Sequence, residues 1–434
     1  TFLVGGCIRD MLLGRSPSDF DIVTFCDVWE KARQISERFA STAFWMDKER
    51  GVARIVIHGS GQTIDVSAPK GADICADLKK RDITINAIGF DAAAGKIIDP
   101  LQGINDLRHG VIRVICEENL RDDPLRVVRC LRFSVMLGFA VVETTDVMLK
   151  KYAHEVKTVS AERIKQEFMK ALSYPSGSRF FSLMDRTGLI EPLFIQDVST
   201  LAGMEVSCIR PALIMACEMD GLIYDARKSL PGIAQALEEE VETGLSRAGL
   251  LRLITFLHGM HSAGEREEDP FGAKIPEPAR EQHIQLVQAF CGSLKFSSPA
   301  MKAAKSIVSC QEHARYILSH NKELTGAELH SLCEEAYPNL PEVLLLAQAK
   351  ANMGGIKKAS GLPERMNAVW SYYVDTYQEH RQCPLISGDD VIHILGLSPG
   401  PRVGKVLRMV ETARAEGIIA SRDEAIEYLR TIAV

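Results

Sequence analysis

The sequence predicts an α+β protein in which a mixed β-sheet with helices comes first and an all-helical part follows. Two observations lead to this prediction. Short apolar stretches separated by glycine turns fill the first 115 or so residues, a pattern typical of strands. From about Leu120 onward, apolar residues recur at helical spacing, as at Leu125, Val128 and Leu131.

The elements can be placed along the chain from these patterns. Strands are expected at residues 1–4, 20–25, 83–91 and 96–98, a helix at 29–40, and a hairpin formed by 52–58 and 62–66. Helices are then expected at 125–135, 145–152 and 161–172, with later loops at Gly188, Pro231-Gly232 and 264–278.

A chain of 434 residues is expected to hold several domains, because single hydrophobic cores rarely exceed about 250–300 residues. The change from sheet to helical patterns sets the first boundary. We divide the chain into a head of residues 1–115, a neck of 116–180, a body of 181–383 and a tail of 384–434.

Composition excludes several classes of protein. The net charge of −6 does not indicate a nucleic-acid binder, although such a binder needs only a local basic face. The 11 cysteines are scattered and form no Cys-x-x-Cys pair, which argues against a zinc ribbon or a disulfide framework and for reduced thiols in a cytoplasmic protein. No apolar run approaches the length of a membrane span, and no signal peptide is visible.

The stretch that carries the chemistry lies near the start. Asp19 and Asp21 alternate on a predicted strand, so both carboxylates point to one face and suit a pair of hard divalent cations such as Mg²⁺. Gly5 and Gly6 precede a helix and let backbone N–H groups approach an anion. Alone, a Gly-Gly is usually a turn, and an Asp-x-Asp is usually a solvated loop or a helix cap. Their order and spacing favour a site for a metal-bound triphosphate.

Five blocks of sequence resemble the class II tRNA nucleotidyltransferase (CCA-adding enzyme) and bacterial poly(A) polymerase family, in the family's order. They lie at residues 3–23, 77–87, 99–107, 122–126 and 161–167. The resemblance implies a nucleotidyltransferase head of the DNA polymerase beta type followed by a helical neck, body and tail. Because family members usually have a short helical segment before the first strand, we expect the natural chain to begin before Thr1.

The resemblance also implies roles for individual residues. Asp19 and Asp21 would be catalytic and would hold two Mg²⁺ ions, and Arg9 would neutralise charge in the transition state. The nucleotide would be bound by Gly5, Gly6, Arg9, Arg81, Asp82, Asn86, Asp123, Arg126 and Arg129.

Three roles stay open in the sequence. Asp65 is either a third metal ligand or a strand residue that faces water. Asp10 either braces Arg9 or caps the helix that starts there. Without the resemblance, Arg81 and Asp82 would be read as a surface ion pair of little energetic weight.

Asp123 and Arg126 are three residues apart on a predicted helix, so both would project from one face. A carboxylate only accepts and a guanidinium only donates, a combination that suits the edges of cytosine and adenine and repels uracil and guanine. The pair would select C and A without a template. The alternative is an ordinary ion pair on a helix surface.

Two departures from the family pattern bear on specificity. Asp122 stands where Glu is usual, which leaves its role less defined. The connection between Val66 and Asp77 is short, and in the family a short connection here is associated with enzymes that add two C residues but not the final A.

The helical part offers weaker signals. The segment 251–261 resembles the histidine–aspartate segment of HD phosphohydrolases, but Gly259 replaces the metal-binding Asp, so His258 and His261 are expected to be packed or solvent-facing. Arg402 and Lys405 in the tail are expected to grip an RNA backbone, the alternative being a plain helix–turn–helix packing unit.

These observations together predict a template-independent tRNA 3′-end nucleotidyltransferase that adds C, A or both. CTP and ATP would be its substrates and tRNA its partner, with no membrane contact. A poly(A) polymerase is the alternative, and a non-catalytic RNA-binding protein is a third reading.

Overall fold

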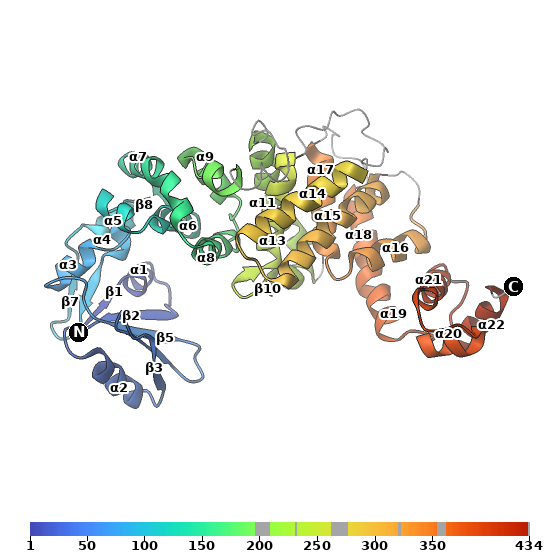
Figure 1. Cartoon of the computed structure of the whole chain (residues 1–434), viewed down its shortest axis with the longest axis horizontal. Coiled ribbons are helices and arrows are strands. Elements are labelled where there is room, and N and C mark those ends of the chain that lie inside the picture. Colours follow the sequence, from blue (N-terminus) through green and yellow to red (C-terminus); the bar gives the residue numbers. More distant parts are fainter. Residues whose placement is uncertain (196–208, 231, 262–276, 320–322, 354–361, 433–434) are drawn as a thin grey trace. The chain divides into compact units, whose positions relative to one another are not determined.

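A computed structural model describes residues 1–195, 209–230, 232–261, 277–319, 323–353 and 362–432 (Figure 1). The predicted fold class is confirmed, since a mixed sheet with helices comes first and helices dominate afterwards. The chain forms two compact units. The first contains Thr1–Tyr174 and Ser182–Gln196, and the second contains Pro175–Phe181 and Asp197–Val434.

The first unit is built on a seven-stranded sheet in the order β3-β4-β5-β2-β1-β6-β7. Its strands are β1 Phe2–Val4, β2 Asp19–Val23, β3 Thr42–Asp47, β4 Val52–Val56, β5 Thr63–Ser67, β6 Gly89–Asp91 and β7 Lys96–Ile98. Strand β2 runs parallel to β5, and every other pair in the sheet is antiparallel.

The two faces of this sheet are covered differently. Helix α2, Val28–Arg38, packs on one face against a core that includes Ile55 and Val66. On the other face, α3, Ile74–Lys79, covers only the end of the central strands near Val23. The rest of this second face carries Asp19, Asp21, Asp65 and Arg54 and, on the edge strand, the exposed Phe44, because alternate residues of a strand point to opposite faces.

The other helices of the first unit are α1 Gly6–Leu12, which lies between β1 and β2 in the sequence, and a series that begins after β7. The series comprises α4 Gly103–His109, α5 Glu117–Asp122, α6 Leu125–Leu137, α7 Glu143–Tyr152 and α8 Ala161–Leu172, with α9 Arg179–Thr187 crossing the boundary between the units. A 3-10 turn η2, Ala153–Thr158, follows α7, a π-helical turn η3, Glu191–Ile195, follows α9, and a two-stranded pair joins β8 Val111–Ile112 to β9 Ala140–Val141. The helix expected at 161–172 is confirmed at the same residues.

One strand was missed, and one expectation about a strand is wrong. Strand β3 was not predicted from the sequence. The strand expected at 83–91 is a 3-10 turn, η1 Thr84–Asn86, followed by the short β6. The turn forms because Thr84 and Asn86 are buried and bond to nearby side chains, Thr84 Oγ1 to Asp106 (2.7 Å) and Asn86 Nδ2 to Asp82 (3.1 Å).

The described part of the second unit is helical apart from one small hairpin, β10 Glu240–Glu242 and β11 Leu245–Ser246. Its body helices are α11 Ile209–Ser229, α12 Ile233–Glu238, α13 Arg247–His261, α14 Glu277–Ser293, α15 Ser298–Ser319, α16 Gly326–Ala336, α17 Leu340–Met353, α18 Leu362–Tyr372, η6 Tyr373–Tyr377 and α19 Gln378–Gln382. The tail helices are α20 Gly388–Leu395, α21 Pro401–Ala415 and α22 Arg422–Ile432, around a core of their own. The loops expected at 264–278 and at Pro231 fall largely outside the described residues.

The segment that resembles an HD domain lies in α13. A Cβ added at Gly259 would lie 2.6 Å from the Cα of Ala212, so this glycine allows α13 to pack closely on α11. His258 is buried, with its ring centroid 4.3 Å from that of His283. The side chain of His261 is not among those described. None of the helices within the described ranges is long and apolar enough to cross a membrane.

Candidate active site

Two carboxylates stand on the open face of the sheet. Asp19 and Asp21 are alternate residues of β2, and both are exposed. Asp19 accepts hydrogen bonds from Thr63 Oγ1 (2.7 Å) and Ser18 Oγ (2.9 Å). The structure therefore brings together the two acids that the sequence places on one strand face.

Asp21 lies among other charged groups. It stands opposite Asp65 in the register of β2 and β5. Desolvation by the surrounding protein and repulsion from Asp65 and Asp19 raise the pKa of the Asp21 carboxyl above its usual value, while Arg81 and Arg129 oppose this shift. A cation bound here would relieve the repulsion between the carboxylates.

The expectation that Asp65 is a strand residue facing water is wrong. Arg54 Nε and Nη2 donate to its two carboxylate oxygens, each at 2.7 Å, and form a bidentate ion pair. The side chain of Asp65 is 23% exposed. It is therefore held by a cation rather than facing water, and its role as a metal ligand stays a prediction.

The residues present fit Mg²⁺ that is shared with a substrate. Within the described ranges, no three His, Cys, Asp or Glu side chains gather closely enough to hold a metal ion by themselves. Mg²⁺ is commonly held by one or two carboxylates together with substrate phosphates. Asp19 and Asp21 supply that number of carboxylates on one face of β2.

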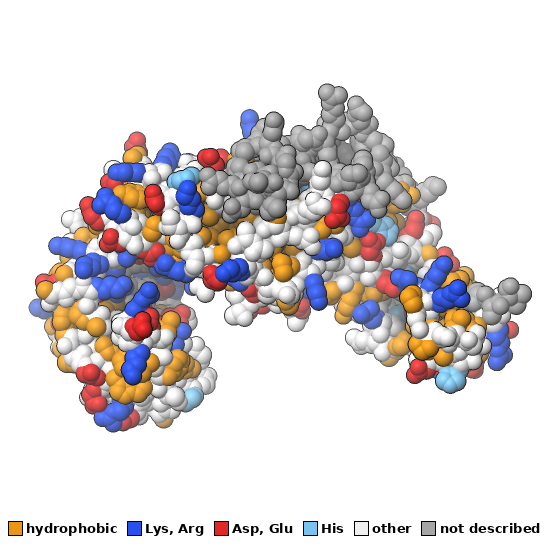
Figure 2. All heavy atoms as spheres, viewed as in Figure 1, with side chains coloured by type: hydrophobic (Ala, Val, Ile, Leu, Met, Phe, Trp, Pro, Cys, Tyr) orange, Lys and Arg blue, Asp and Glu red, His pale blue; other side chains and the backbone are white. Residues whose placement is uncertain are grey.

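The glycine turn lies directly beside these acids. Gly5 has φ of 80°, and a Cβ added to it would lie 2.5 Å from Arg81 Nη1 and 3.3 Å from Asp21 Oδ2. Both the left-handed backbone and the close approach require glycine. A Cβ at Gly6 would lie 3.6 Å from Arg9 Nη2. Figure 2 shows Lys and Arg side chains gathered between the elements that Figure 1 labels α1 and α3.

Arg9 is buried beneath this turn and is braced on two sides. Its Nε and Nη2 each donate to Asp10 at 2.9 Å, and its Nη1 donates to Asn86 Oδ1 at 2.7 Å. Gly5 is the N-cap residue of α1, so Asp10 braces Arg9 and does not cap the helix. Arg9 also lies 5.2 Å from the ring centroid of Phe133 in α6.

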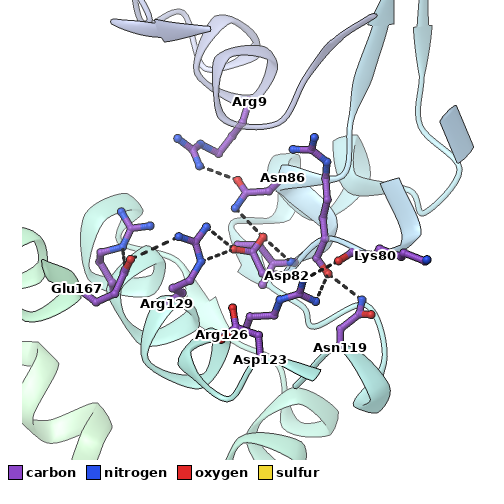
Figure 3. A network of polar contacts seen from close by, with 12 residues as sticks. Arg9, Lys80, Asp82, Asn86, Asn119, Asp123, Arg126, Arg129 and Glu167 are labelled. Atoms are coloured by element: carbon purple, nitrogen blue, oxygen red, sulfur yellow. Dashed lines mark hydrogen bonds and ion pairs between the residues drawn. The ribbon is translucent and has the colours of Figure 1, made fainter. Parts of the chain in front are cut away.

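Asp82 is the centre of the polar network in Figure 3. It is 6% exposed and accepts from Arg129 Nε and Nη2 (2.9 and 2.7 Å), Asn86 Nδ2 (3.1 Å) and the N–H of Ile83 (2.9 Å). Burial alone would raise the pKa of Asp82, but the charge of Arg129 and these hydrogen bonds hold it at about 2. The alternative of a surface ion pair between Arg81 and Asp82 is therefore wrong.

The network continues from Asp82 into α6 and α8. Arg129 Nη1 lies 3.4 Å from Glu167 Oε1, and Arg132 Nε lies 2.5 Å from Glu167 Oε2. Glu167 is buried and therefore needs the two cations around it. An unbroken chain of contacts thus runs from Arg9 through Asn86, Asp82 and Arg129 to Glu167 (Figure 3).

The prediction that Asp123 and Arg126 lie on one helix is wrong. Asp123 ends α5 with extended backbone (φ −146°), and only Arg126 belongs to α6. The cause is Pro124, because a residue before proline is disfavoured in the helical conformation. Asp123 Oδ2 accepts from Arg163 Nη2 at 2.8 Å.

Arg126 is held by the backbone of the preceding block. Its Nη2 donates to the carbonyl of Lys80 at 2.7 Å and its Nη1 to that of Arg81 at 3.3 Å. Asn119 Nδ2 donates to the carbonyls of Lys79 and Arg81, each at 2.8 Å. The segment that carries Arg81 and Asp82 is therefore fixed from the α5–α6 side.

The two tail residues belong to the other compact unit. Arg402 and Lys405 are exposed near the start of α21, and Lys405 lines a shallow pocket with Arg408 and Tyr428. The RNA-binding role of Arg402 and Lys405 stays a prediction.

Sequence reasoning missed four residues that organise the site. Glu167 and Arg163 lie in the fifth block of sequence that resembles the family, at residues 161–167, but the sequence did not indicate their partners Arg129 and Asp123. Asn119 and Arg54 carried no signal in the sequence, because their partners lie 38–40 and 11 residues away.

We expect Asp82→Asn to destabilise the protein in a pH-dependent way. Because folding lowers the pKa of Asp82 to about 2, its charge contributes stability above about pH 4 that is lost as the pH falls toward 2. Leaving Arg129 without this partner should cost about 3–5 kcal/mol at neutral pH. Thermal unfolding followed by circular dichroism should give a lower Tm for the variant at pH 7 and a smaller difference near pH 2.

Asp47→Asn serves as the matched control. Asp47 pairs with Arg50 at 3.6 Å on the surface, so its loss should change the Tm little at any pH. A difference between the Asp82→Asn variant and the wild type that stays constant from pH 7 to pH 2 would contradict the assignment.

Comparisons with known proteins agree with this architecture. The family model "Poly A polymerase head domain" matches residues 1–113. The model "Probable RNA and SrmB-binding site of polymerase A" matches residues 138–198, and a model of tRNA nucleotidyltransferase domain 2 matches residues 281–429.

Relatives match along nearly the whole chain. The CC-adding tRNA nucleotidyltransferase of Geobacter sulfurreducens is 29% identical over 99% of this chain and 91% of its own length. The A-adding tRNA nucleotidyltransferase of Deinococcus radiodurans is 27% identical over 99% of this chain and 94% of its own length.

The fold also resembles that of a solved structure, the Thermotoga maritima CCA-adding enzyme complexed with tRNA. The TM-score is 0.65 at 20% sequence identity, over 100% of this chain and 91% of that one. With the head and the tail matched by separate models and two relatives aligned almost end to end, the chain belongs to the family of tRNA nucleotidyltransferases and bacterial poly(A) polymerases.

Proposed function

We propose that this protein is a tRNA 3′-end nucleotidyltransferase that adds two cytidines from CTP, without a template, and releases pyrophosphate. One observation carries the reaction class. Asp19 and Asp21 share the open face of the sheet, and the guanidinium of Arg81, which follows α3, lies beside Asp21 at the Gly5 turn. This arrangement provides metal ligands and triphosphate ligands within one small area.

Mg²⁺ held by Asp19 and Asp21 would lower the pKa of the attacking 3′-hydroxyl and neutralise the leaving pyrophosphate. The chain's own residues bind and orient the substrate. The N–H of Gly5 donates to the carbonyl of Ile88 at 3.0 Å, so the N–H of Gly6, at the start of α1, is the one that would face the triphosphate. Arg81 and Arg9 contribute positive charge from beside and beneath the turn.

The side chain of Asn86 is fixed in one orientation by two hydrogen bonds. Its Oδ1 accepts from Arg9 and its Nδ2 donates to Asp82, which fixes the orientation of its amide. An amide fixed in this way places its remaining donor and acceptor capacity at a defined position. We assign Asn86 to the ribose of the incoming nucleotide.

Asp123 and Arg126 are assigned to the base edge. Asp123 bonds to Arg163 through Oδ2, which leaves Oδ1 to accept from the amino group of cytosine or adenine. Arg126 Nη1 and Nη2 donate to backbone carbonyls, which fixes its guanidinium in place. A carbonyl group of uracil or guanine facing Asp123 would place two acceptors opposite each other, with no donor between them.

The connection between β5 and α3 supports the choice of CC addition. It spans only residues 68–73, and it is anchored because the N–H of Lys70 donates to Asp77 Oδ1 at 2.9 Å. A Cβ at Gly71 would lie 2.5 Å from Ala76 Cβ, so the connection also lies close against α3. A short connection at this place is the family feature associated with CC addition, and the Geobacter relative has a name that agrees.

The length of the product tests the function directly. The protein is incubated with Mg²⁺, CTP and ATP and with tRNAs that end before C74, after C75 or after A76. We expect two cytidines on the first tRNA and no addition to the other two. Addition of a single A to the tRNA ending at C75 would indicate A or CCA addition, and long adenosine tails would indicate a poly(A) polymerase.

In the same assay, Asp19→Ala and Asp21→Ala should each lower incorporation at least 100-fold, on the order of losses for transition-state charge stabilisers. Their tRNA binding should persist. Asp47→Ala, on the outer strand β3, should retain activity. Full activity in either β2 variant would contradict the metal assignment.

Asp123→Ala should relax the choice of nucleotide. Loss of the repelling carboxylate should raise relative incorporation of UTP and GTP, by roughly 10-fold for about 1.4 kcal/mol of discrimination. Single-nucleotide incorporation rates with each of the four nucleoside triphosphates provide the measurement. Arg163→Ala tests whether the Asp123 carboxylate itself selects the base or whether it must be held by Arg163. This variant removes the hydrogen bond to Asp123 but keeps the carboxylate. Unchanged discrimination in the Asp123→Ala variant would refute the assignment.

A further inference from the structure

The open face of the sheet extends well beyond the carboxylates. Phe44 in β3 stands opposite Arg54 in β4, Arg54 stands opposite Asp65 in β5, and Asp65 stands opposite Asp21 in β2. Directly paired residues point to the same face of a sheet. An unbroken row of four side chains therefore leads from the acid Asp21 to an aromatic ring at the edge of the sheet.

The outer end of this row is apolar and exposed. Phe44 is 45% exposed, and Met46, two residues further along β3 where the register with β4 shifts, is 55% exposed. Strand β3 is the last in the strand order, so beyond it this sheet has no further strand in residues 1–195. Exposed apolar side chains on an edge strand are usually avoided in soluble proteins, which indicates that this pair meets a partner.

Arg54 links the apolar end to the acids. Its Nε and Nη2 bond to Asp65, while its Nη1 has no hydrogen-bond acceptor among the residues that the structure describes. The Arg54 side chain is 33% exposed. On a face that carries Asp19, Asp21 and Asp65, this guanidinium offers a polyanion positive charge together with free donors.

An aromatic ring next to a cation suits single-stranded RNA. Bases stack on aromatic side chains whatever their sequence, and arginine binds the phosphate backbone. Three strand spacings of about 4.8 Å separate β3 from β2. Successive nucleotides of a stacked strand are about 3.4 Å apart, so the distance from β2 to β3 corresponds to several nucleotides. If the RNA 3′ end lies at Asp21, a nucleotide upstream of that end would therefore lie over β3.

We propose that Phe44, Met46 and Arg54 form a seat for the unpaired nucleotides just upstream of the RNA 3′ end. The base stacks on Phe44 beside Met46, and its phosphate pairs with Arg54 Nη1. The inference rests on the proposed function, because it takes the reactive 3′-hydroxyl to lie at Asp19 and Asp21. The seat would give the enzyme a grip on the RNA end that is independent of the base sequence.

The test compares two exposed phenylalanines of the same unit. Phe39 is 53% exposed and follows α2, which packs on the opposite face of the sheet. With CTP saturating, Phe44→Ala should raise KM for tRNA about 10-fold, equivalent to about 1.4 kcal/mol of stacking. Its kcat and its KM for CTP should not change. Phe39→Ala should behave as the wild type, and Phe44→Trp should restore tight binding.

A modified RNA provides a second and independent readout. An abasic site at the nucleotide that stacks on Phe44 should raise KM for the wild type as much as Phe44→Ala does. Combining both changes should add little, because they remove the same contact. Arg54→Gln should lower the slope of log KM against log salt concentration by about one, as expected for a lost phosphate contact.

Three outcomes would overturn the proposal. Phe44→Ala and Phe39→Ala could give the same KM for tRNA, or abasic sites upstream of the 3′ end could act additively with Phe44→Ala. Sedimentation could also show that Phe44→Ala disrupts self-association while KM for tRNA is unchanged, which would make β3 a contact between copies. In each of these cases the wild-type protein would still incorporate nucleotides, so the proposed function would hold. If the wild-type protein incorporated no nucleotide at all, the proposed function itself would be contradicted.

Discussion

A buried negative charge at Asp82 sets the constraint on which the site depends. A carboxylate removed from water is stable only with a cation and hydrogen-bond donors around it. Asp82 obtains these from Arg129 in α6 and from Asn86 in the η1 turn. The same bonds therefore hold the turn that carries Asn86 against the helix that carries Arg129, and stability and substrate positioning share one set of contacts.

This constraint extends to the neighbouring cations. Arg129 is drawn by both Asp82 and Glu167, and Arg132 completes the pairing of Glu167. The ring of Phe133 lies 4.0 Å from the Arg132 guanidinium and 5.2 Å from that of Arg9. Cations over an aromatic face are stabilised by its negative potential, so Phe133 connects the glycine turn to α6 without a further charge.

The sheet separates packing from chemistry by the alternation of its strands. Ile55 and Val66 form the core under α2, while the residues that alternate with them form the row from Asp21 to Phe44. A slip of one residue in the register would bury the acids and expose the core. The hydrophobic core of the sheet thus fixes which face carries the carboxylates.

Much of this arrangement was predictable because local rules govern it. The alternation around Asp19 and Asp21 and the glycine turn follow from local periodicity and turn chemistry. The 3-10 turn at Thr84–Asn86 was missed because its cause is burial and bonding to Asp106 and Asp82, which the local pattern does not contain. The position of Asp123 outside the helix did follow from a local rule, the effect of Pro124, which the helical periodicity obscured.

A double-mutant cycle on incorporation kinetics tests the central claim, that the Asp82–Arg129 pair holds the nucleotide site in place. The kcat/KM for CTP is measured for Asp82→Asn, Arg129→Gln and the double variant at pH 7. If the pair acts as one unit, each single change and the double change should lower kcat/KM by similar factors. The account would be contradicted if the fold losses in kcat/KM of the two single variants multiplied in the double variant. It would also be contradicted if either single variant had the kcat/KM of the wild type.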